Sequence, residues 1–303
     1  MLDQVSQMNG IIAVVNTPFT ADNKIDIESL RRYVQLALKN RVVGFLVPAM
    51  AAEVDKLTIE ERETMVRTVL EAANGTAPVI GGASAADQKT RLMLSENLIK
   101  IHCDAILVCI PFENEDQYCR DVRQIAELKP NCLVIQEWDF RGYGVPVPVI
   151  AKLFRELEVF RCLKVEVVPA GAKYSAVIQA TGGKLHVSGG WAASQMIEGL
   201  DRGVNAFMAT ILHDIYGKVY ELHRSGERKR AQALFYHLLP ILSFSHQHPD
   251  ICIHFNKRMM HRLGIFSTFK VREPILPFDS YHQRVADELM EKALRLSASL
   301  KAT

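Results

Sequence analysis

The sequence predicts a (β/α)8 barrel with a C-terminal three-helix extension. Short apolar runs alternate with amphipathic stretches about eight times along the first 225 residues. The runs are rich in Val and Ile and apolar on both faces, as strands of a helix-covered parallel sheet are. This alternation indicates the α/β class, and eight units in ~210 residues fit a closed barrel better than an open sheet. An open doubly wound sheet is the alternative, but no G-x-G-x-x-G follows the first run.

Each expected strand precedes an expected helix, with no linker and no repeat of fixed period. The strands are expected at 10–15, 42–48, 78–82, 105–111, 132–136, 162–168, 184–190 and 204–210. The helix after the second strand has the clearest boundaries. Thr58 and Glu61 form a T-x-x-E capping box at its start, and Gly75 supplies a stop.

The strand pattern ends at about residue 225. We therefore expect residues 1–225 to form the barrel and residues 226–303 a C-terminal extension of three helices. Pro274 and Pro277 interrupt the helical pattern before the last of them. The extension is too small, and its helix faces too apolar, to fold alone. We expect it to pack on the barrel or to contribute to an oligomer interface.

Composition excludes several classes of function. The formal charge is only +2 and 23% of the residues are charged. This near balance gives no excess of positive charge that would bind nucleic acid or an anionic membrane. No apolar run reaches the ~18–20 residues that span a bilayer. The N-terminus lacks a basic region followed by an apolar core, so we expect a cytoplasmic protein.

The cysteines and histidines do not suggest a metal centre. The six cysteines include no C-x-x-C pair, and several lie in apolar runs, so we expect buried, reduced thiols. Four histidines fall together near the C-terminus without a ligand-like spacing, which favours a surface or interface role over metal binding. They are His246, His248, His254 and His261.

The active site of such a barrel lies at the carboxyl ends of its strands. The polar residues that close the apolar runs are Thr17, Glu53, Ser84, Glu113, Gln136, Glu137, Asp139, Lys164, Glu166, Ser188 and Thr210. Lys164 is distinctive because burial in an apolar strand favours its neutral amine, the form that attacks a ketone to make an imine. A lysine that extends from the strand end to solvent, or one that only pairs with Glu166, is an equal alternative. Glu166 shares a face with Lys164 in an extended strand and is either an ion-pair partner or an acid/base.

Five stretches give the chain a family resemblance. They are NTPF at 16–19, AMAAEVDKLTIEER at 49–62, IPF at 110–112, LKVE at 163–166 and SGG at 188–190. In order and spacing these resemble the dihydrodipicolinate synthase and N-acetylneuraminate lyase family of class I aldolases, over roughly residues 10–300. The resemblance implies a (β/α)8 barrel, usually in a homotetramer or another homo-oligomer such as a dimer. It also implies a small-molecule 2-keto acid as substrate, with no metal and no organic cofactor.

By the same resemblance, Lys164 forms a Schiff base with pyruvate or another 2-keto acid. The imine is an electron sink that acidifies C3 and permits aldol cleavage, aldol addition or loss of a C4 substituent. The resemblance places Gly189 among the substrate-binding residues. It also places Met50 and Ala51 there, where backbone N–H groups can hold the carboxylate. Arg141 keeps the place of a family arginine, where it either binds the distal end of the substrate or is a solvated loop residue.

Three departures from the family pattern bear on function. The family loop G-[TS]-T-G-E is Ala49-Met50-Ala51-Ala52-Glu53 here, without either hydroxyl, and Glu113 replaces a tyrosine of the P-Y-Y motif. Gln136 stands where the family has an acid/base tyrosine, and an amide exchanges no proton near neutral pH. Glu166 is then the first candidate for the acid/base and Glu137 the second, with Gln136 orienting the substrate or a water.

These departures argue against the function of a true dihydrodipicolinate synthase. The glutamine followed by an acidic residue, together with K-x-E at 164–166, is similar to the 2-keto-3-deoxy-sugar-acid dehydratases. We therefore expect a Schiff-base lyase, with dehydration favoured over aldol cleavage. The alternative is a catalytically silent relative that binds a keto acid, which the lost hydroxyls favour. Against it, an idle lysine would be costly in an apolar strand.

Overall fold

The eight expected strands are present and form a closed parallel barrel in the order β1 to β8 in the computed structural model, which describes residues 4–301. The strands are β1 (Gly10–Val14), β2 (Gly44–Val47), β3 (Val79–Gly82), β4 (Ala105–Cys109), β5 (Leu133–Asp139), β6 (Phe160–Val167), β7 (His186–Gly189) and β8 (Ala206–Ala209). The predicted fold class is confirmed. Nearly every strand residue is buried, which explains why these segments are apolar on both faces.

A helix follows each strand. These helices are α1 (Ile27–Lys39), α2 (Ile59–Ala73), α3 (Gln88–Lys100), α4 (Glu115–Glu127), α5 (Val147–Glu156), α6 (Gly171–Ala180), α7 (Met196–Asp201) and α8 (His213–Arg224). Four of them, α1 to α4, begin at a side-chain cap. The predicted capping box of Thr58 and Glu61 opens α2, and Asp26 caps α1 in the same way through the backbone N–H of Ser29.

By its internal contacts the chain divides into two compact units. Unit 1 comprises residues 1–10 and 78–208, and unit 2 comprises residues 11–77 and 209–303. The boundary expected at residue 225 is a different one, because it separates the barrel from its C-terminal extension. That boundary stays a prediction.

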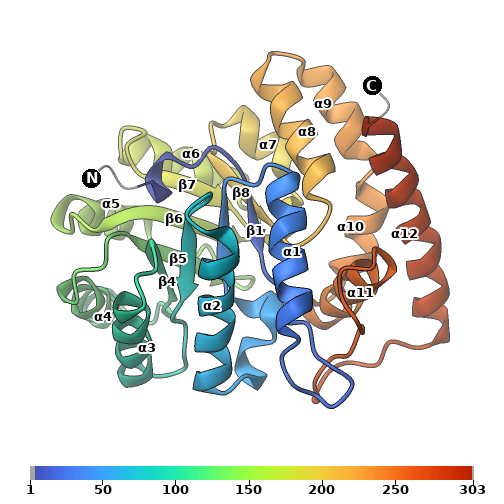
Figure 1. The fold of residues 1–303 in the computed structure, drawn as a ribbon. Coiled ribbons are helices and arrows are strands. Elements are labelled where there is room, and N and C mark those ends of the chain that lie inside the picture. Colours follow the sequence, from blue (N-terminus) through green and yellow to red (C-terminus); the bar gives the residue numbers. More distant parts are fainter. Residues whose placement is uncertain (1–3, 302–303) are drawn as a thin grey trace. The chain divides into compact units, whose positions relative to one another are not determined.

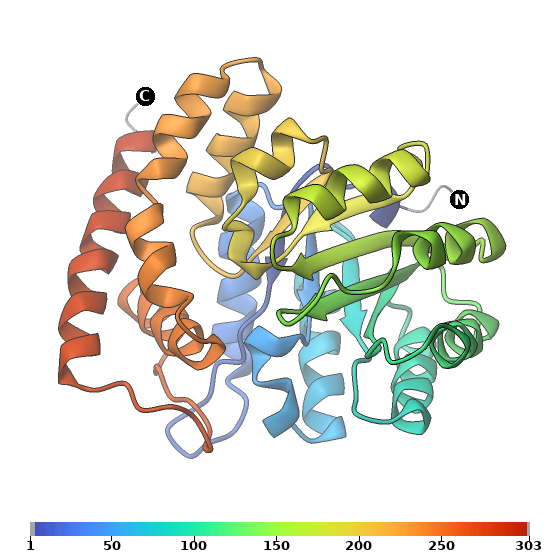
Figure 2. The ribbon, with the colours of Figure 1, turned by 180° about the vertical axis from the view of Figure 1, so that it is seen from behind.

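Unit 1 holds the longest strands, β5 and β6, which lie side by side (Figure 2). Their register pairs Gln136 with Lys164 and Trp138 with Glu166. On the other side of β6, Lys164 pairs with Ser188 of β7. Strand β5 extends three residues beyond its expected end at 136, and this brings Trp138 and Asp139 into the sheet.

In unit 2, α1 and α2 lie side by side (Figure 1). Gln35 of α1 donates to the carbonyl of Ala72 of α2, 3.0 Å away. The long C-terminal helix α12 (Ser280–Lys301) contacts α8 and the C-terminal helix α10 (Leu239–Ser245), as Figure 2 shows. Ser297 of α12 donates a hydrogen bond to Asp214 of α8.

The C-terminal extension has four helices in the described part of the chain, where three were expected. They are α9 (Arg228–Tyr236), α10, α11 (Pro249–Arg262) and α12. The segment expected to be one helix is broken between Tyr236 and Leu239. Pro240 lies in the first turn of α10. If α9 and α10 were one continuous helix, Pro240 would have no N–H to donate to the carbonyl of Tyr236, and its ring would clash with that carbonyl.

Within residues 4–301, no helix is both long enough and apolar enough to cross a membrane. The same residues bring no three His, Cys, Asp or Glu side chains together as a metal site would require. Of the four C-terminal histidines, His248 caps α11, and His254 and His261 contact the carbonyls of Leu276 and Phe266.

Candidate functional site

Lys164 lies in the middle of β6, where strand alternation turns it to the same face as Glu166. Both side chains are buried, and Lys164 Nζ lies 3.1 Å from Glu166 Oε2. The shared face was expected from the two-residue spacing alone. A buried lysine needs a partner that offsets the loss of hydration, and Glu166 supplies it.

Glu166 is the centre of a small polar network in unit 1. Its Oε2 also accepts a hydrogen bond from the amide Nε2 of Gln136, across the β5–β6 pair. Its Oε1 accepts one from the backbone N–H of Trp191, at 2.7 Å. We call Gln136, Lys164 and Glu166 the lysine site. The structure therefore brings these three sequence candidates together.

The glycines of the SGG turn differ in what they contact. A Cβ at Gly190 would lie 2.1 Å from Glu166 Oε1, so a side chain there would displace the carboxylate. A Cβ at Gly189 would instead meet the ring of Phe207 at 2.7 Å and the hydroxyl oxygen of Tyr174 at 2.8 Å. Substrate binding was expected at Gly189, but the packing of Phe207 and Tyr174 is enough to explain why this position has no side chain. Its neighbour Gly190 makes room for the lysine site.

Glu137, the second acid/base candidate, faces away from Lys164. Its carboxylate lies 3.0 Å from Lys173 Nζ of α6 and accepts the backbone N–H of Val145 at 3.0 Å. Lys173 also donates to the carbonyls of Tyr143 and Val145. Burial raises the pKa of Glu137 to about 7, although Lys173 acts in the opposite direction. This pair fixes the loop between β5 and α5.

Asp139 and Arg141 lie in that same loop. The carboxylate of Asp139 accepts the backbone N–H groups of Arg141, Gly142 and Gly144, at 2.8, 2.9 and 3.1 Å. These bonds lower the pKa of Asp139. Asp139 therefore shapes the loop, and Arg141 is exposed.

An aromatic cluster that the sequence reasoning missed adjoins the lysine site. It consists of Trp138, Phe140 and Trp191, whose ring centroids lie 4.5 to 5.6 Å apart. Trp138 and Phe140 follow Gln136 at alternate positions, a signal visible in the sequence. Trp191 comes from the turn after β7, and no sequence pattern connects it to the other two.

The remaining strand-end candidates of unit 1 are less engaged with the lysine site. Ser84 accepts the backbone N–H of Cys109 at 3.0 Å, and Glu113 is exposed. Ser188 donates to the carbonyl of Leu163, 3.4 Å away. Burial raises the pKa of the Cys109 thiol to about 11, so it is protonated near neutral pH and is no nucleophile.

Met50 and Ala51 lie in unit 2, in the short helix η2 (Met50–Ala52) after β2. Asn16 donates to the carbonyl of Ala51 at 2.5 Å, and Thr17 donates to that of Ala52 at 2.6 Å. The NTPF stretch thus fixes the loop that lacks the family hydroxyls.

Glu53, which follows η2, has a left-handed backbone with φ of 56°. Its buried carboxylate binds Lys257 Nζ of α11, Lys56 Nζ at 3.4 Å and the backbone N–H of Arg272 at 2.9 Å. Burial lowers the pKa of Lys257 to about 8. We call Glu53, Lys56, Lys257 and Arg272 the Glu53 cluster, and Lys257 is a member that the sequence reasoning missed.

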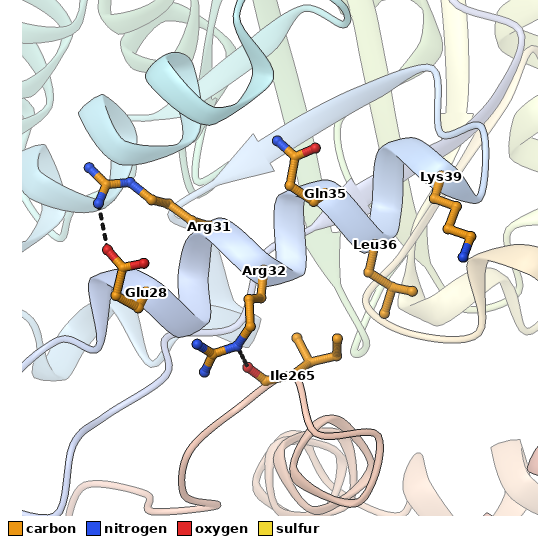
Figure 3. Close-up of a pocket in the computed structure, with 7 residues that line it drawn as sticks. All are labelled: Glu28, Arg31, Arg32, Gln35, Leu36, Lys39 and Ile265. Atoms are coloured by element: carbon orange, nitrogen blue, oxygen red, sulfur yellow. Dashed lines mark hydrogen bonds and ion pairs between the residues drawn. The ribbon is translucent and has the colours of Figure 1, made fainter.

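Unit 2 also has a surface pocket of about 370 Å3 along α1 (Figure 3). It is lined by Glu28, Arg31, Arg32, Gln35, Leu36, Lys39 and Ile265. Arg31 pairs with Glu28 at 2.6 Å, and Arg32 donates to the carbonyl of Ile265 at 2.9 Å. Two of its cations are thus already engaged, and its lysine, Lys39, is exposed, unlike the buried Lys164.

Comparison with known proteins identifies the class. Residues 7–293 match the Dihydrodipicolinate synthetase family, and the chain belongs to that family. A protein of Methanopyrus kandleri named 4-hydroxy-tetrahydrodipicolinate synthase is 27% identical over 253 residues, covering 78% of this chain and 80% of that protein. A protein of the same name from Staphylococcus epidermidis is 32% identical over 106 residues, which is 35% of this chain and 36% of that protein.

Solved structures agree on the fold. The dihydrodipicolinate synthase of Rhodopseudomonas palustris superposes with a TM-score of 0.88 at 22% identity, over 95% of this chain and 98% of that one. YagE of Escherichia coli K12 superposes with a TM-score of 0.84 at 19% identity, over 95% of this chain and 98% of that one. It is described as a prophage protein of the dihydrodipicolinic acid synthase family in complex with pyruvate.

Proposed function

We propose that the chain is a lyase that forms a Schiff base between Lys164 and a 2-oxo acid, and that it is not a dihydrodipicolinate synthase. The observation that carries the proposal is the buried contact of 3.1 Å between Lys164 Nζ and Glu166 Oε2, with Gln136 in the place of the family tyrosine. A carboxylate that close can exchange a proton with the amine and with a bound substrate.

The reaction begins when the neutral amine of Lys164 attacks C2 of the 2-oxo acid and water leaves. The resulting iminium withdraws electrons from C3 and C4. In dehydration, the Glu166 carboxylate takes a proton from C3 to give the enamine. It then returns this proton to the C4 hydroxyl, which leaves as water when the C4–O bond breaks. In aldol cleavage, Glu166 takes the C4 hydroxyl proton while the C3–C4 bond breaks. Gln136 does not titrate and holds the carboxylate of Glu166 in place.

Dehydration of a 2-keto-3-deoxy sugar acid is the favoured form of the reaction, and aldol chemistry with pyruvate is the second. By resemblance to the family, we propose backbone N–H groups at Met50, Ala51 and Gly189 as contacts of the substrate carboxylate, and Arg141 as the contact of the distal end of the substrate. No metal or organic cofactor takes part in these steps. The protein acts as a homo-oligomer, a tetramer or a dimer.

A keto-acid-binding protein without turnover is the second candidate. The loss of both hydroxyls from the loop at 49–53 favours it. Such a protein would form the imine with a broad panel of 2-oxo acids and release every one of them unchanged.

Replacing Lys164 with Ala tests the lyase. We expect turnover of the best 2-oxo acid to fall below about one per cent of the parent, because no other amine can form the imine. Circular dichroism and the unfolding midpoint report whether the variant is folded. Lys152→Ala, which removes an exposed partner of Glu115, is the matched control. Activity retained by a folded Lys164→Ala variant would contradict the proposal.

A further inference from the structure

We infer that Lys173 is a positioning residue for the substrate: together with Glu137 it fixes the loop between β5 and α5 and so holds Arg141 in place. This inference rests on the proposed function, which assigns Arg141 to the distal end of the substrate. Lys173 itself lies on α6, acts through the loop and touches no substrate atom. It therefore governs how tightly the distal end is bound, while the chemistry at Lys164 proceeds without it.

The loop of residues 140–146 contains neither helix nor strand, yet its backbone is bonded at several points. The side chains that hold it are those of Asp139, Glu137 and Lys173. Between them they bond N–H or C=O groups of the consecutive residues Arg141, Gly142, Tyr143, Gly144 and Val145. A loop bonded in this way has its conformation before a substrate arrives, and such preorganisation improves affinity. Arg141, which is exposed, lies near the start of this loop.

Lys173 is the residue that joins the loop to the barrel. Its side chain is fully buried, and its Nζ lies 3.0 Å from Glu137 Oε1 of β5. It also donates to the carbonyl of Tyr143 at 2.8 Å and to that of Val145. A lysine ammonium has three N–H donors, and these three acceptors use them all. One cation thus connects a barrel strand to two points of the loop.

Stability alone does not account for the pair of Glu137 and Lys173. Glu137 Oε2 is buried and has no hydrogen-bond partner among the described residues. A buried ion pair with an unsatisfied oxygen is costly, and an apolar pair of similar volume is often as stable or more stable. The ion pair supplies direction, which an apolar pair lacks, because each N–H donor fixes one acceptor. The pair therefore serves the conformation of the loop.

Strand alternation connects this anchor to the lysine site without mixing the two. Gln136 and Glu137 are consecutive on β5, so their side chains point to opposite faces of the strand. Gln136 donates to Glu166 in the lysine site, and Glu137 binds Lys173 on the other face. Loosening the loop should therefore weaken binding of the distal end and leave the imine-forming residues in place.

Gly144 shows how closely the loop packs against its anchor. Its φ is +67°, and a Cβ there would lie 2.8 Å from Val167 Cγ1 and 3.3 Å from Glu137 Oε1. A side chain at this position is strained by the backbone and also meets both neighbours. Gly144→Ala should therefore displace the loop without altering Lys173 or Arg141, which gives a second route to the same test.

The first experiment compares Lys173→Met with the parent on two compounds. They are 2-keto-3-deoxyarabonate and 4-hydroxy-2-oxopentanoate, which has the same carbon chain without the C5 hydroxyl. The readouts are kcat and the concentration that gives half-maximal imine trapping by borohydride. For the sugar acid we expect this concentration to rise about tenfold and kcat to change less than about threefold. For the compound without the hydroxyl we expect little change in either.

The outcomes of this experiment separate the two claims. An equal rise for both compounds, or a fall in kcat alone, would overturn the inference and leave the proposed function intact. Absence of any adduct on the parent with either compound would contradict the proposed function, on which the inference rests.

A double-mutant cycle tests whether Lys173 acts through Arg141. We expect Lys173→Met and Arg141→Ala each to raise the half-maximal concentration for the sugar acid about tenfold. The double variant should show no more than either single change, because both remove the same contact. A merely structural role would not produce this coupling. Additive effects, about a hundredfold in the double variant, would contradict the inference.

Further variants guard against misfolding and general destabilisation. Should Lys173→Met fail to fold, Gly144→Ala should show the same dependence on the C5 hydroxyl and the same coupling to Arg141→Ala. Glu137→Gln keeps an oxygen acceptor for Lys173 and Val145, so we expect a smaller effect than for Glu137→Leu. Lys152→Met, which removes an exposed lysine of α5, is the matched control. Parent-like binding in both Lys173→Met and Gly144→Ala would overturn the inference.

Discussion

At the residue scale, Glu166 serves two opposing requirements. It holds Lys164 Nζ at 3.1 Å, and under the proposed mechanism it must also exchange protons with a substrate. Gln136 and the backbone N–H of Trp191 each donate to one of its oxygens. These two donors fix the direction of the carboxylate, as the proposed proton transfer requires.

Glu166→Gln keeps the shape of the side chain and removes its proton exchange. Under the proposed mechanism we expect kcat to fall about 100-fold or more, since acid/base catalysis contributes that much. Imine trapping by borohydride should persist, because Lys164 is intact. Single-turnover kinetics beside intact-mass spectrometry separates the two steps. Turnover at the parent's rate would exclude Glu166 as the proton carrier.

Glu137 gives a prediction on pH and stability. Its pKa in the folded chain is about 7, above the usual 4.5, so the folded state holds the proton more tightly than the unfolded state. This contribution to the free energy of unfolding is fully present below about pH 4.5 and is lost as the pH rises to about 7. Glu137→Gln cannot ionise, and we expect its free energy of unfolding to improve relative to the parent across that window.

The measurement for Glu137 is urea unfolding of both proteins at pH 5 and pH 7.5. Asp139→Asn is the control, because its carboxyl has a lowered pKa and titrates below this window. A parent-to-variant difference that stays constant between the two pH values would contradict the raised pKa of Glu137.

At the element scale, the Glu53 cluster joins the loop after β2 to α11 and to the segment around Arg272. Lys257 lies 204 positions from Glu53 in the sequence, and both side chains are buried. Lys257 Nζ also lies 4.2 Å from the centroid of Phe19, in the NTPF stretch. This cluster therefore fixes the ends of two strand–helix loops of unit 2.

Removing one member of the ion pair between Glu53 and Lys257 should lower the free energy of unfolding more than removing both members. We expect Lys257→Met to lower the free energy of unfolding by about 3 kcal/mol, because it leaves a buried carboxylate short of a cation. Glu53→Gln combined with Lys257→Met should recover much of that loss. Lys24→Met, which breaks the exposed pair with Asp22, should have little effect. Equal losses in the single and double variants would contradict this view of the cluster.

The elements also show what the sequence could predict. The capping box of Thr58 and Glu61 depends on residues three apart, and the shared face of Lys164 and Glu166 depends on residues two apart. Both were predicted and are found. The break between α9 and α10 was missed, although Pro240 marks it, because the apolar pattern continues across it.

At the scale of the whole molecule, contacts between segments far apart in the chain could not be predicted from the sequence. The bond from Gln136 to Glu166 depends on the register of β5 against β6, which no local pattern encodes. The approach of Trp191 to Trp138 depends on the turn after β7. The barrel itself was predictable, because eight apolar runs with helices between them leave few other folds.

The proposed function depends on an imine between Lys164 and a 2-oxo acid. Intact-mass spectrometry after borohydride reduction with pyruvate tests it most directly, with Lys164→Ala as the control. We expect the mass of one reduced pyruvate imine on each chain of the parent and none on the variant. No adduct on the parent, or an equal adduct on Lys164→Ala, would contradict the claim.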